Sequence, residues 1–309
     1  MDIYRCAGEI PPPPAARAVA IGNFDGLHLG HRRIIERLKK GAAALGVPAC
    51  VLTFSPHPEK VFGPARLRMI QSLDQRLRGL CEWGVDAAVV WPFDRAFARL
   101  DGEAFAARIL AARLNARVVV VGDDFRFGRG RSAGPVALKR FGRGHGFSVL
   151  AVPPLKRGGR VVRSSRIRDL LGAGRIEEAA GLLGRPYAVE GDVIAGEGMG
   201  RTLGYPTANI LTPNEILPRG VFVTLLEWKD RRYPSVTSVG FRPTFGKRAL
   251  TIECHVLSFS RNLYGAPVRL YFLGKLREER KFRNADALQD QIAADAAAAR
   301  TYFRRRPHL

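Results

Sequence analysis

The stretch AVAIGNFDGLHLGHRRIIERL (residues 18–38) decides the fold of the first half of the chain. Its apolar beginning is typical of a buried strand, and Ile34, Ile35 and Leu38 follow at helical spacing. The same alternation of an apolar run with a helix continues downstream, with further runs at 48–54, 86–91, 116–122 and 147–152. Continuous apolar strands separated by helices are typical of a parallel sheet that is covered on both faces. We therefore expect a doubly wound α/β domain over residues 1–183.

The turn between the first strand and its helix carries candidate chemistry. His28 and His31 flank Gly30 where the helix is expected to begin. A helix N-terminus favours phosphate, and two imidazoles there can donate hydrogen bonds as negative charge builds up. Gly22 and Gly26 would let a nucleotide approach the backbone. An isolated HxGH would indicate two surface histidines, but this turn is where open α/β sheets bind ligands, which favours a functional interpretation.

The pattern changes from Tyr187 onward. Short β-like segments, such as YAVEGDVI (187–194) and GVFVTLLEW (220–228), alternate with turns rich in Gly, Pro and Asn. This spacing favours a small antiparallel barrel or sandwich. An Ala-rich amphipathic helix that starts near Asn284 is expected to dock on it. We place this second domain at residues 184–309.

The composition bounds the partners and the location. The 309 residues carry a formal net charge of +22, which would attract nucleic acid, an anionic membrane surface or small polyphosphates, and charge alone does not distinguish them. No run of about 20 apolar residues occurs, and the first residues lack a signal-peptide pattern. Cys6, Cys50, Cys81 and Cys254 form no CxxC pair, which indicates reduced thiols. We expect a soluble cytoplasmic protein without nucleic-acid or membrane partners, and at most weak self-association.

The first-domain motifs resemble those of a known family. GNFDGLHLGH (22–31) resembles the HxGH signature of the nucleotidylyltransferase superfamily, and the longer string is similar to bacterial bifunctional riboflavin kinase/FAD synthetases. FSPHP (54–58), GDDFRFGRGRSAG (122–134) and VRSSRIR (162–168) follow in the family's order. The resemblance implies that the FMN phosphate attacks the α-phosphorus of ATP, with FAD and pyrophosphate as products. Such a reaction depends on positioning and charge stabilisation, for which Gly, His, Ser and Arg are suited.

The resemblance also implies roles for individual residues of this domain. His28 and His31 would be catalytic. The residues implied for ATP and its phosphates are Gly22, Asn23, Phe24, Gly26, Gly30, Ser164, Ser165 and Arg168. The residues implied for the flavin are His57, Asp124, Phe125, Arg126 and Phe127, although His57 and the two phenylalanines are also explained by packing in a turn. Arg163 departs from the family, which has a serine there.

The second domain resembles riboflavin kinases through GYPTAN (204–209), GFRPTF (240–245), LTIECHVL (250–257) and LYG (263–265). The resemblance implies that Thr207 and Asn209 bind the Mg²⁺ of the nucleotide, and Mg²⁺ prefers such oxygen ligands. It implies that Glu253 takes the proton of the riboflavin 5′-hydroxyl group. The residues implied for the ATP phosphates are Gly196, Gly198, Gly200 and Arg201.

Without the resemblance, the glycine-rich segment 184–210 indicates a flexible hairpin loop. A glutamate in a strand, such as Glu253, is normally a surface residue. Two further positions depart from the family. Ser238 stands where the family has Asn, and Ser258 stands where it has Asp. Both keep a polar side chain, so we expect them to modulate flavin affinity.

Two other hypotheses remain beside the bifunctional enzyme, whose ligands would be riboflavin, FMN, FAD, ATP, ADP, pyrophosphate and Mg²⁺. Only the HxGH domain could be active, as in pantetheine-phosphate adenylyltransferases, but the intact PTAN motif and Glu253 argue against a degenerate barrel. A nucleic-acid-binding protein would need clustered basic residues or aromatic residues among them, and the sequence has no such stretch.

Overall fold

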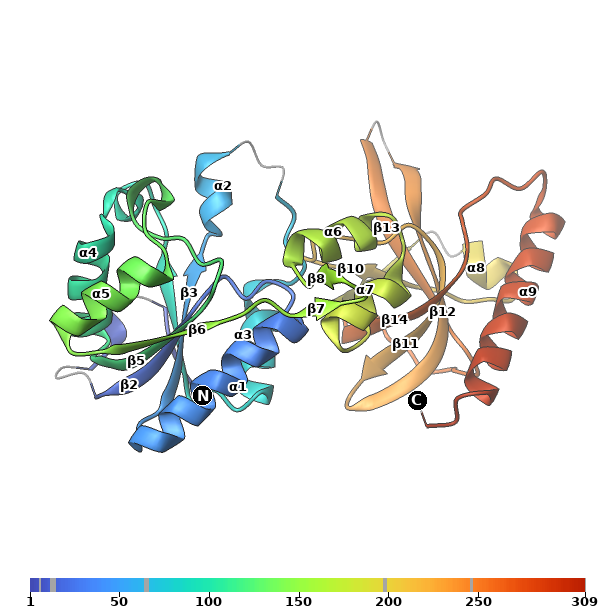
Figure 1. The fold of residues 1–309 in the computed structure, drawn as a ribbon. Helices are drawn as coiled ribbons and strands as arrows, with labels where there is room; N and C mark the ends of the chain where they lie inside the picture. The colour runs from blue at the N-terminus through green and yellow to red at the C-terminus, as the bar shows by residue number, and fades with distance from the viewer. Residues whose placement is uncertain (6, 12–14, 64–66, 197–198, 245–246, 309) are drawn as a thin grey trace. The chain divides into compact units, whose positions relative to one another are not determined.

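The computed structural model describes residues 1–309 except 6, 12–14, 64–66, 197–198, 245–246 and 309. Its contacts form two compact units, Met1–Ser164 and Ser165–Leu309. A sheet flanked by helices makes up most of the first unit, and a barrel with a long helix makes up most of the second (Figure 1).

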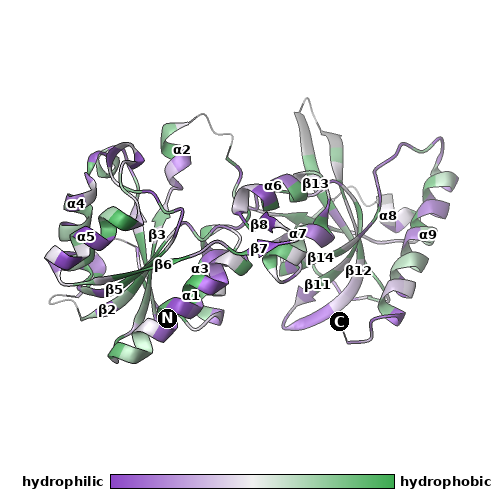
Figure 2. Cartoon of the chain, in the orientation of Figure 1, coloured by the Kyte–Doolittle hydropathy of each residue, from purple (hydrophilic) through white to green (hydrophobic). Residues whose placement is uncertain are grey.

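The first unit is built on a six-stranded parallel sheet in the order β1-β4-β3-β2-β5-β6. The strands are β1 (Asp2–Tyr4), β2 (Arg17–Ile21), β3 (Ala49–Ser55), β4 (Ala87–Pro92), β5 (Ala116–Gly122) and β6 (Ser148–Val152). Every residue of β2 is buried, which requires helices on both faces of the sheet. Figure 2 shows the central strands as mostly hydrophobic and the helices as mixed. The predicted doubly wound sheet is confirmed, but the short edge strand β1 was not predicted.

The connections of this unit contain helices of several kinds. The α-helices are α1 (Leu29–Leu45), α2 (Pro58–Phe62), α3 (Leu73–Glu82), α4 (Gly102–Ala104) and α5 (Pro135–His145). The 3₁₀ turns are η1 (Ala7–Glu9), η2 (Phe97–Arg99) and η4 (Arg129–Arg131), and η3 (Phe105–Arg113) is a π-helix. Ser72 and Gln75 form a capping box that fixes the start of α3. A small hairpin of β7 (Lys156–Arg157) and β8 (Arg160–Val161) ends the unit.

The second unit is a closed antiparallel barrel in the order β10-β13-β12-β11-β14-β9. Its strands are β9 (Tyr187–Ile194), β10 (Ala208–Leu211), β11 (Gly220–Trp228), β12 (Arg231–Thr244), β13 (Lys247–Val256) and β14 (Pro267–Arg277). Its helices are α6 (Ser164–Gly172), which begins at the division, α7 (Ile176–Leu183), α8 (Met199–Thr202) and α9 (Ala285–Arg304). Asn284 caps α9, and α9 packs against β12. The antiparallel prediction is confirmed, and the barrel is closed.

The division by contacts lies earlier than the domain boundary that we expected at residue 183. Helix α7 ends at Leu183 and packs against β14 and β9, so it is grouped with the barrel. The boundary at 183 stays a prediction.

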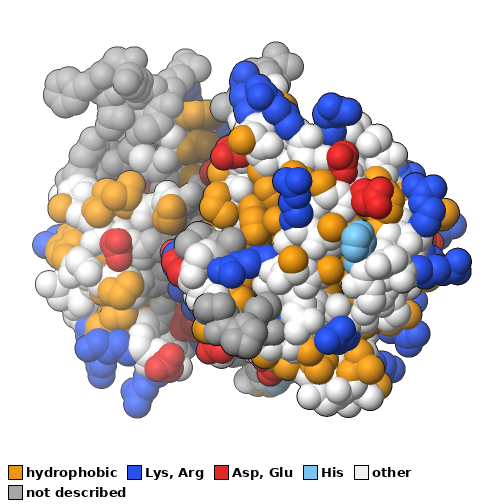
Figure 3. All heavy atoms as spheres, turned by 90° about the vertical axis from the view of Figure 1, so that its left-hand side faces the viewer, with side chains coloured by type: hydrophobic (Ala, Val, Ile, Leu, Met, Phe, Trp, Pro, Cys, Tyr) orange, Lys and Arg blue, Asp and Glu red, His pale blue; other side chains and the backbone are white. Residues whose placement is uncertain are grey.

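The surface and the cysteines complete the description. On the face shown in Figure 3, Lys and Arg side chains are spread among uncharged groups. Cys50, Cys81 and Cys254 are free thiols, whereas Cys6 lies outside the described residues. Burial raises the pKa of Cys50 to about 12. Within the described ranges, no helix combines the length and the apolar character needed to cross a membrane.

Candidate active sites

The first candidate site is the turn between β2 and α1. His28 is the N-cap of α1, because its Nδ1 accepts a hydrogen bond from the His31 N–H at 3.1 Å. Since Nδ1 accepts, the proton of the neutral ring is on Nε2, which is therefore a donor. The two imidazole rings stack with centroids 3.6 Å apart and planes 14° from parallel. The structure thus brings the two predicted catalytic histidines together at a helix N-terminus.

The backbone of this turn is tight and partly strained. Phe24, Leu27 and Gly26 have positive φ values of 50°, 43° and 88°, and two of these residues are not glycine. A Cβ atom at position 30 would lie 3.0 Å from Cε1 of His28, so Gly30 leaves the space that this ring occupies. The turn is therefore built for one conformation.

Side chains from neighbouring segments hold the turn in place. Arg76 on α3 donates from Nη1 to the Asn23 carbonyl at 2.6 Å. The Asp25 carboxylate accepts from the Ile70 N–H at 3.0 Å, and the Asp25 carbonyl accepts from the Ser164 hydroxyl at 2.8 Å. Burial lowers the pKa of Arg76, and the nearby Asp25 carboxylate opposes that shift. Ser164, which we expected to bind phosphate, therefore also supports the turn.

The predicted flavin residues of this unit are partly buried. His57 is 7% exposed, and its Nδ1 caps α2 by accepting from the Glu59 N–H at 3.2 Å. Phe127 is 8% exposed and stacks on Phe125 with centroids 5.3 Å apart. Phe127 continues into a chain of ring contacts made by Phe105, Phe97, Trp91, Phe93, Phe54 and Phe62. Apart from the exposed Phe62, these rings form an aromatic part of the hydrophobic core, and Phe54 on β3 and Trp91 on β4 belong to it.

Asp124 and Arg126 of the same loop are exposed. Asp124 Oδ2 lies 3.8 Å from Nη2 of Arg163, the residue that departs from the family pattern. Arg126 donates from Nη1 to the Phe125 carbonyl at 2.9 Å. Arg163 is thus directed toward the predicted flavin loop.

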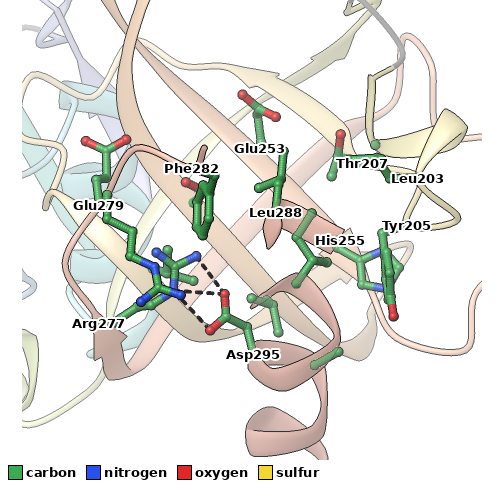
Figure 4. Close-up of a pocket in the computed structure, with 17 residues that line it drawn as sticks. Leu203, Tyr205, Thr207, Glu253, His255, Arg277, Glu279, Phe282, Leu288 and Asp295 are labelled. Carbon is green, nitrogen blue, oxygen red and sulfur yellow. Dashed lines mark hydrogen bonds and ion pairs between the residues drawn. The ribbon is translucent and has the colours of Figure 1, made fainter. Parts of the chain in front are cut away.

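The second candidate site is a pocket in the barrel unit (Figure 4). Its apolar lining comes from Leu203, Val221, Val236, Phe282, Leu288, Ile292 and Ala296. Its polar lining comes from Thr207, Ser238, Glu253, His255, Arg277, Glu279, Arg280 and Asp295, together with Gly200 and Tyr205. An apolar pocket with a few converging polar groups is the usual form of a small-molecule site.

The PTAN and IECH motifs meet at this pocket although they lie far apart in the sequence. Asn209 on β10 and Ser238 on β12 are both paired in register with Glu253 on β13. Residues directly opposite each other on antiparallel strands point to the same face of the sheet. Figure 4 shows Thr207 beside Glu253 on one side of the pocket. The predicted base and the predicted metal ligands are therefore neighbours.

The glycine-rich loop packs against these ligands. A Cβ atom at Gly196 would overlap the Asn209 side chain, and one at Gly200 would lie 3.1 Å from the Thr207 hydroxyl oxygen. Arg201 is exposed on α8, and Gly198 lies outside the described residues. Glycine at 196 and 200 thus lets the loop pack directly against the side chains of Asn209 and Thr207.

Helix α9 closes one side of the pocket through an ion pair. Arg277 on β14 makes a bidentate contact with Asp295, with Nη2 to Oδ2 at 2.8 Å and Nε to Oδ1 at 3.1 Å. Glu279 lies near the same rim, 3.8 Å from Arg219. Burial raises the pKa of Glu279, and the Arg219 charge opposes this.

The comparisons with known proteins agree with this division of chemistry. The family model described as FAD synthetase matches residues 11–166, and the one described as riboflavin kinase matches residues 183–303. The bifunctional riboflavin kinase/FMN adenylyltransferase of Escherichia coli K12 is 35% identical over 297 residues, which cover 94% of each chain. That of Pseudomonas fluorescens is 35% identical over 302 residues, which cover 97% of each chain. The chain belongs to the bifunctional riboflavin kinase/FMN adenylyltransferase family.

A solved structure supports the fold of this family member. A chain from Streptococcus pneumoniae called a macrolide-efflux protein matches with a TM-score of 0.88 and 31% identity, over 96% of this chain and 98% of that one. The name of that protein refers to efflux, and the similarity is used here for the fold alone.

Several residues of the two candidate sites were not predicted from the sequence. Arg76 carried a usable signal, because it falls between Leu73, Leu77 and Leu80 on the face of α3 that should be apolar. Asp25 stood within the quoted motif but was assigned no role. Arg277 and Asp295 gave no such signal, because an ion pair between a strand and a distant helix depends on the tertiary fold.

The two kinase-domain departures have different surroundings. Ser238 lines the pocket opposite Glu253, whereas Ser258 is exposed after β13 with a φ of 52°. Aspartate adopts that backbone region more readily than most residues, so the backbone conformation is one physical reason for an aspartate there. The effect of Ser258 on flavin affinity stays a prediction. Of the other residues expected to bind phosphate in adenylyl transfer, Ser165 is exposed and Arg168 is half-buried, both on α6.

Proposed function

We propose that the barrel domain transfers the γ-phosphate of ATP to riboflavin, and that the sheet domain then joins FMN and ATP into FAD. The observation that carries the first step is that Thr207 and Glu253 line one pocket, with Asn209 paired in register opposite Glu253. The observation that carries the second is the stacked His28–His31 pair at the N-terminus of α1. Riboflavin, FMN, ATP, ADP, FAD and pyrophosphate are the proposed ligands.

In the kinase reaction, Glu253 acts as the general base. The riboflavin 5′-oxygen forms a bond to the γ-phosphorus while the bond from that phosphorus to the β,γ-bridging oxygen breaks and ADP leaves. Glu253 accepts the hydroxyl proton as the new bond forms. The apolar wall made by Leu288, Ile292 and Phe282 supports a flavin ring placed in the same pocket. Ser238, opposite Glu253, offers a hydroxyl group that can orient the ribityl chain.

The residues around Thr207 and Asn209 fit Mg²⁺. Both provide side-chain oxygen atoms, which are the ligands that Mg²⁺ prefers, and Thr207 lines the pocket beside Glu253. Among the described residues, no cluster of three His, Cys, Asp or Glu side chains could hold a metal ion, so the nucleotide phosphates and water would supply the other ligands. When bound, Mg²⁺ would withdraw negative charge from the phosphate oxygens.

In the adenylyl transfer, an oxygen of the FMN phosphate forms a bond to the α-phosphorus of ATP as the bond to the leaving pyrophosphate breaks. The Nε2–H of His28 and the ring of His31 donate to phosphate oxygens as charge builds up. The backbone of Gly22–Gly30 approaches the nucleotide, and Ser165 and Arg168 contribute phosphate contacts. Phe125, Phe127 and His57 support the flavin from the aromatic side.

This proposal accounts for the basic character of the chain. The net charge is +22, and on the face that Figure 3 shows the Lys and Arg side chains are scattered, which favours small anionic substrates over one nucleic-acid groove. The intact kinase pocket argues against a degenerate barrel. Location in the cytoplasm and weak self-association stay predictions.

The test is to incubate the purified chain with riboflavin, ATP and Mg²⁺ and to separate the flavins by chromatography over time. We expect FMN first and FAD second. FMN without FAD would reject the adenylyltransferase. A parallel incubation supplies FMN in place of riboflavin: FAD formed there, with no product from riboflavin, would reject the kinase, and no product in either incubation would reject both.

A further inference from the structure

The loop before β10 is folded tightly on itself. The Tyr205 N–H donates to the Gly200 carbonyl at 2.7 Å, and the Gly204 N–H donates to the Arg201 carbonyl at 3.1 Å. Gly204 has a φ of 82°, which favours glycine. The loop ends at Thr207, the proposed Mg²⁺ ligand, so any movement of residues 199–206 also moves the Thr207 hydroxyl.

One side chain of the barrel wall holds the end of this loop. Nδ1 of His255 lies 2.9 Å from the Pro206 carbonyl oxygen. Because a carbonyl oxygen only accepts, Nδ1 carries the proton and donates. Pro206 has no N–H group, so its carbonyl is the only backbone group through which this residue can be hydrogen-bonded. The His255 ring also contacts the edge of Tyr205, with centroids 5.4 Å apart at 77°.

The position of His255 links the loop to the candidate base. His255 is two residues beyond Glu253 on β13, so both side chains lie on the same face of the strand, and both line the pocket. Figure 4 shows His255 and Tyr205 together beside Thr207. Strand β13, which carries the proposed proton acceptor, therefore also holds Pro206, the residue next to the proposed Mg²⁺ ligand Thr207.

We propose that His255 is a positioning residue of the kinase site, which sets the distance between Thr207 and Glu253 through its Nδ1 bond to Pro206. This inference rests on the proposed function of that pocket. Removing a side chain that orients a metal ligand without touching the metal itself lowers metal affinity or activity by about 10–100-fold.

A second contact reaches the same loop from helix α9. Nε2 of Gln289 donates to the Leu203 carbonyl at 3.2 Å. Gln289 is exposed, and Leu203 is four residues from Thr207, so this contact constrains the ligand less directly. Gln289→Ala therefore serves as a matched control for the loss of one loop contact.

The test uses His255→Asn, His255→Gln and His255→Ala in the full chain, with Gln289→Ala as the control. Gln289→Ala should change the Mg²⁺ dependence and the KM for ATP less than His255→Ala does. The amide nitrogen of Asn stands where Nδ1 of His stands, whereas the longer Gln places its amide nearer to Nε2. His255→Ala and His255→Gln should raise the half-saturating Mg²⁺ concentration and the KM for ATP of the kinase by about 10-fold, with the KM for riboflavin within 2-fold. His255→Asn should restore most of this loss.

A readout that is independent of turnover is hydrogen exchange, measured by mass spectrometry on peptides that cover residues 199–209. Exchange in this loop should be faster than wild type in the Ala and Gln variants and near wild type in the Asn variant. FMN adenylylation, measured on the same preparations, reports that the chain is folded.

The outcomes separate the inference from the function on which it rests. A wild-type chain without riboflavin phosphorylation would reject the kinase assignment and this inference with it. An active wild type with unchanged Mg²⁺ dependence in His255→Ala would reject the inference alone. If Gln restores function better than Asn, the useful atom is Nε2, and positioning through Pro206 is wrong.

Discussion

The two sites differ in how the chain builds them. In the sheet domain, one turn between Gly22 and His31 supplies the backbone, the helix N-terminus and both imidazoles. In the barrel domain, the pocket combines Thr207, Glu253, Arg277 and Asp295 from strands, a loop and a helix that are distant in sequence. The chemistry differs in parallel. A phosphate attacking phosphorus needs no base, whereas an alcohol does, and the barrel places the Glu253 carboxylate beside the proposed Mg²⁺ ligands.

The largest expected effect comes from removing the proposed general base, Glu253, which only one of the two reactions should need. Glu253→Gln should lower riboflavin phosphorylation by about 10²–10⁴, because glutamine keeps the size but does not accept the proton. FMN adenylylation should be unchanged, since FMN already carries its phosphate. Steady-state assays of both reactions on one preparation check this, with a thermal melt for folding. Kinase activity within a few-fold of wild type would mean that Glu253 is not the base.

The complementary change concerns His28. His28→Asn should lower FMN adenylylation by about 10²–10³ while FMN formation continues. Asparagine is a good N-cap, so it can still accept from the His31 N–H, but it lacks the Nε2–H donor. His28→Ala removes both features and should lose stability as well. If the Asn variant stays fully active, the role of His28 is only to cap α1.

These two predictions depend on motifs that were visible in the sequence, and this was possible for a physical reason. A strand, a tight turn and a helix are local, so residues 18–38 were sufficient to predict this unit and the place of His28 and His31. The further apolar runs down to residue 152 then predicted the parallel sheet. The pairing of Asn209 with Glu253 depends on strand register across the barrel. The resemblance to the family assigned Asn209 and Glu253 to one site, whereas their spacing in the sequence gave no sign that they are neighbours.

Other features were beyond sequence reasoning because they depend on long-range packing. β1 has three residues and pairs with β4 more than 80 residues later. The bond of Arg76 to Asn23 and the bond of His255 to Pro206 each join separate segments. In the π-helix η3, backbone hydrogen bonds join residues five apart instead of four. Its sequence favours a helix but does not show which of the two forms it takes.

A smaller effect tests the packing of α9 against the barrel. Asp295 is 7% exposed at its side chain and Arg277 is 20% exposed, so Asp295→Ala leaves a mostly buried guanidinium without its bidentate partner. We expect the barrel domain to lose about 3 kcal/mol of stability, with the sheet domain unchanged. Calorimetric unfolding with assignment of the two transitions measures this. The exposed Asp290 on the same helix provides the control, since Asp290→Ala should change neither transition.

The smallest expected effect concerns Arg163, where this chain departs from its family in the sheet domain. Arg163 Nη2 lies 3.8 Å from Asp124 Oδ2, and the side chains are 57% and 67% exposed. Ion pairs this exposed contribute little to stability. Arg163→Ser, which restores the family residue, should therefore keep FMN adenylylation within a few-fold of wild type and leave riboflavin phosphorylation unchanged.

The appropriate control for Arg163→Ser is Arg160→Ser, which removes the same charge from the exposed strand β8 three residues earlier. If only the general positive field attracts ATP, the two variants should raise the KM for ATP equally, and added salt should reduce both effects because exposed charges are screened. A large loss confined to Arg163→Ser, persisting at high salt, would contradict the expectation. It would mean that this chain uses Arg163 as a direct ligand of the leaving pyrophosphate, a role for which its long reach from the start of α6 is suited.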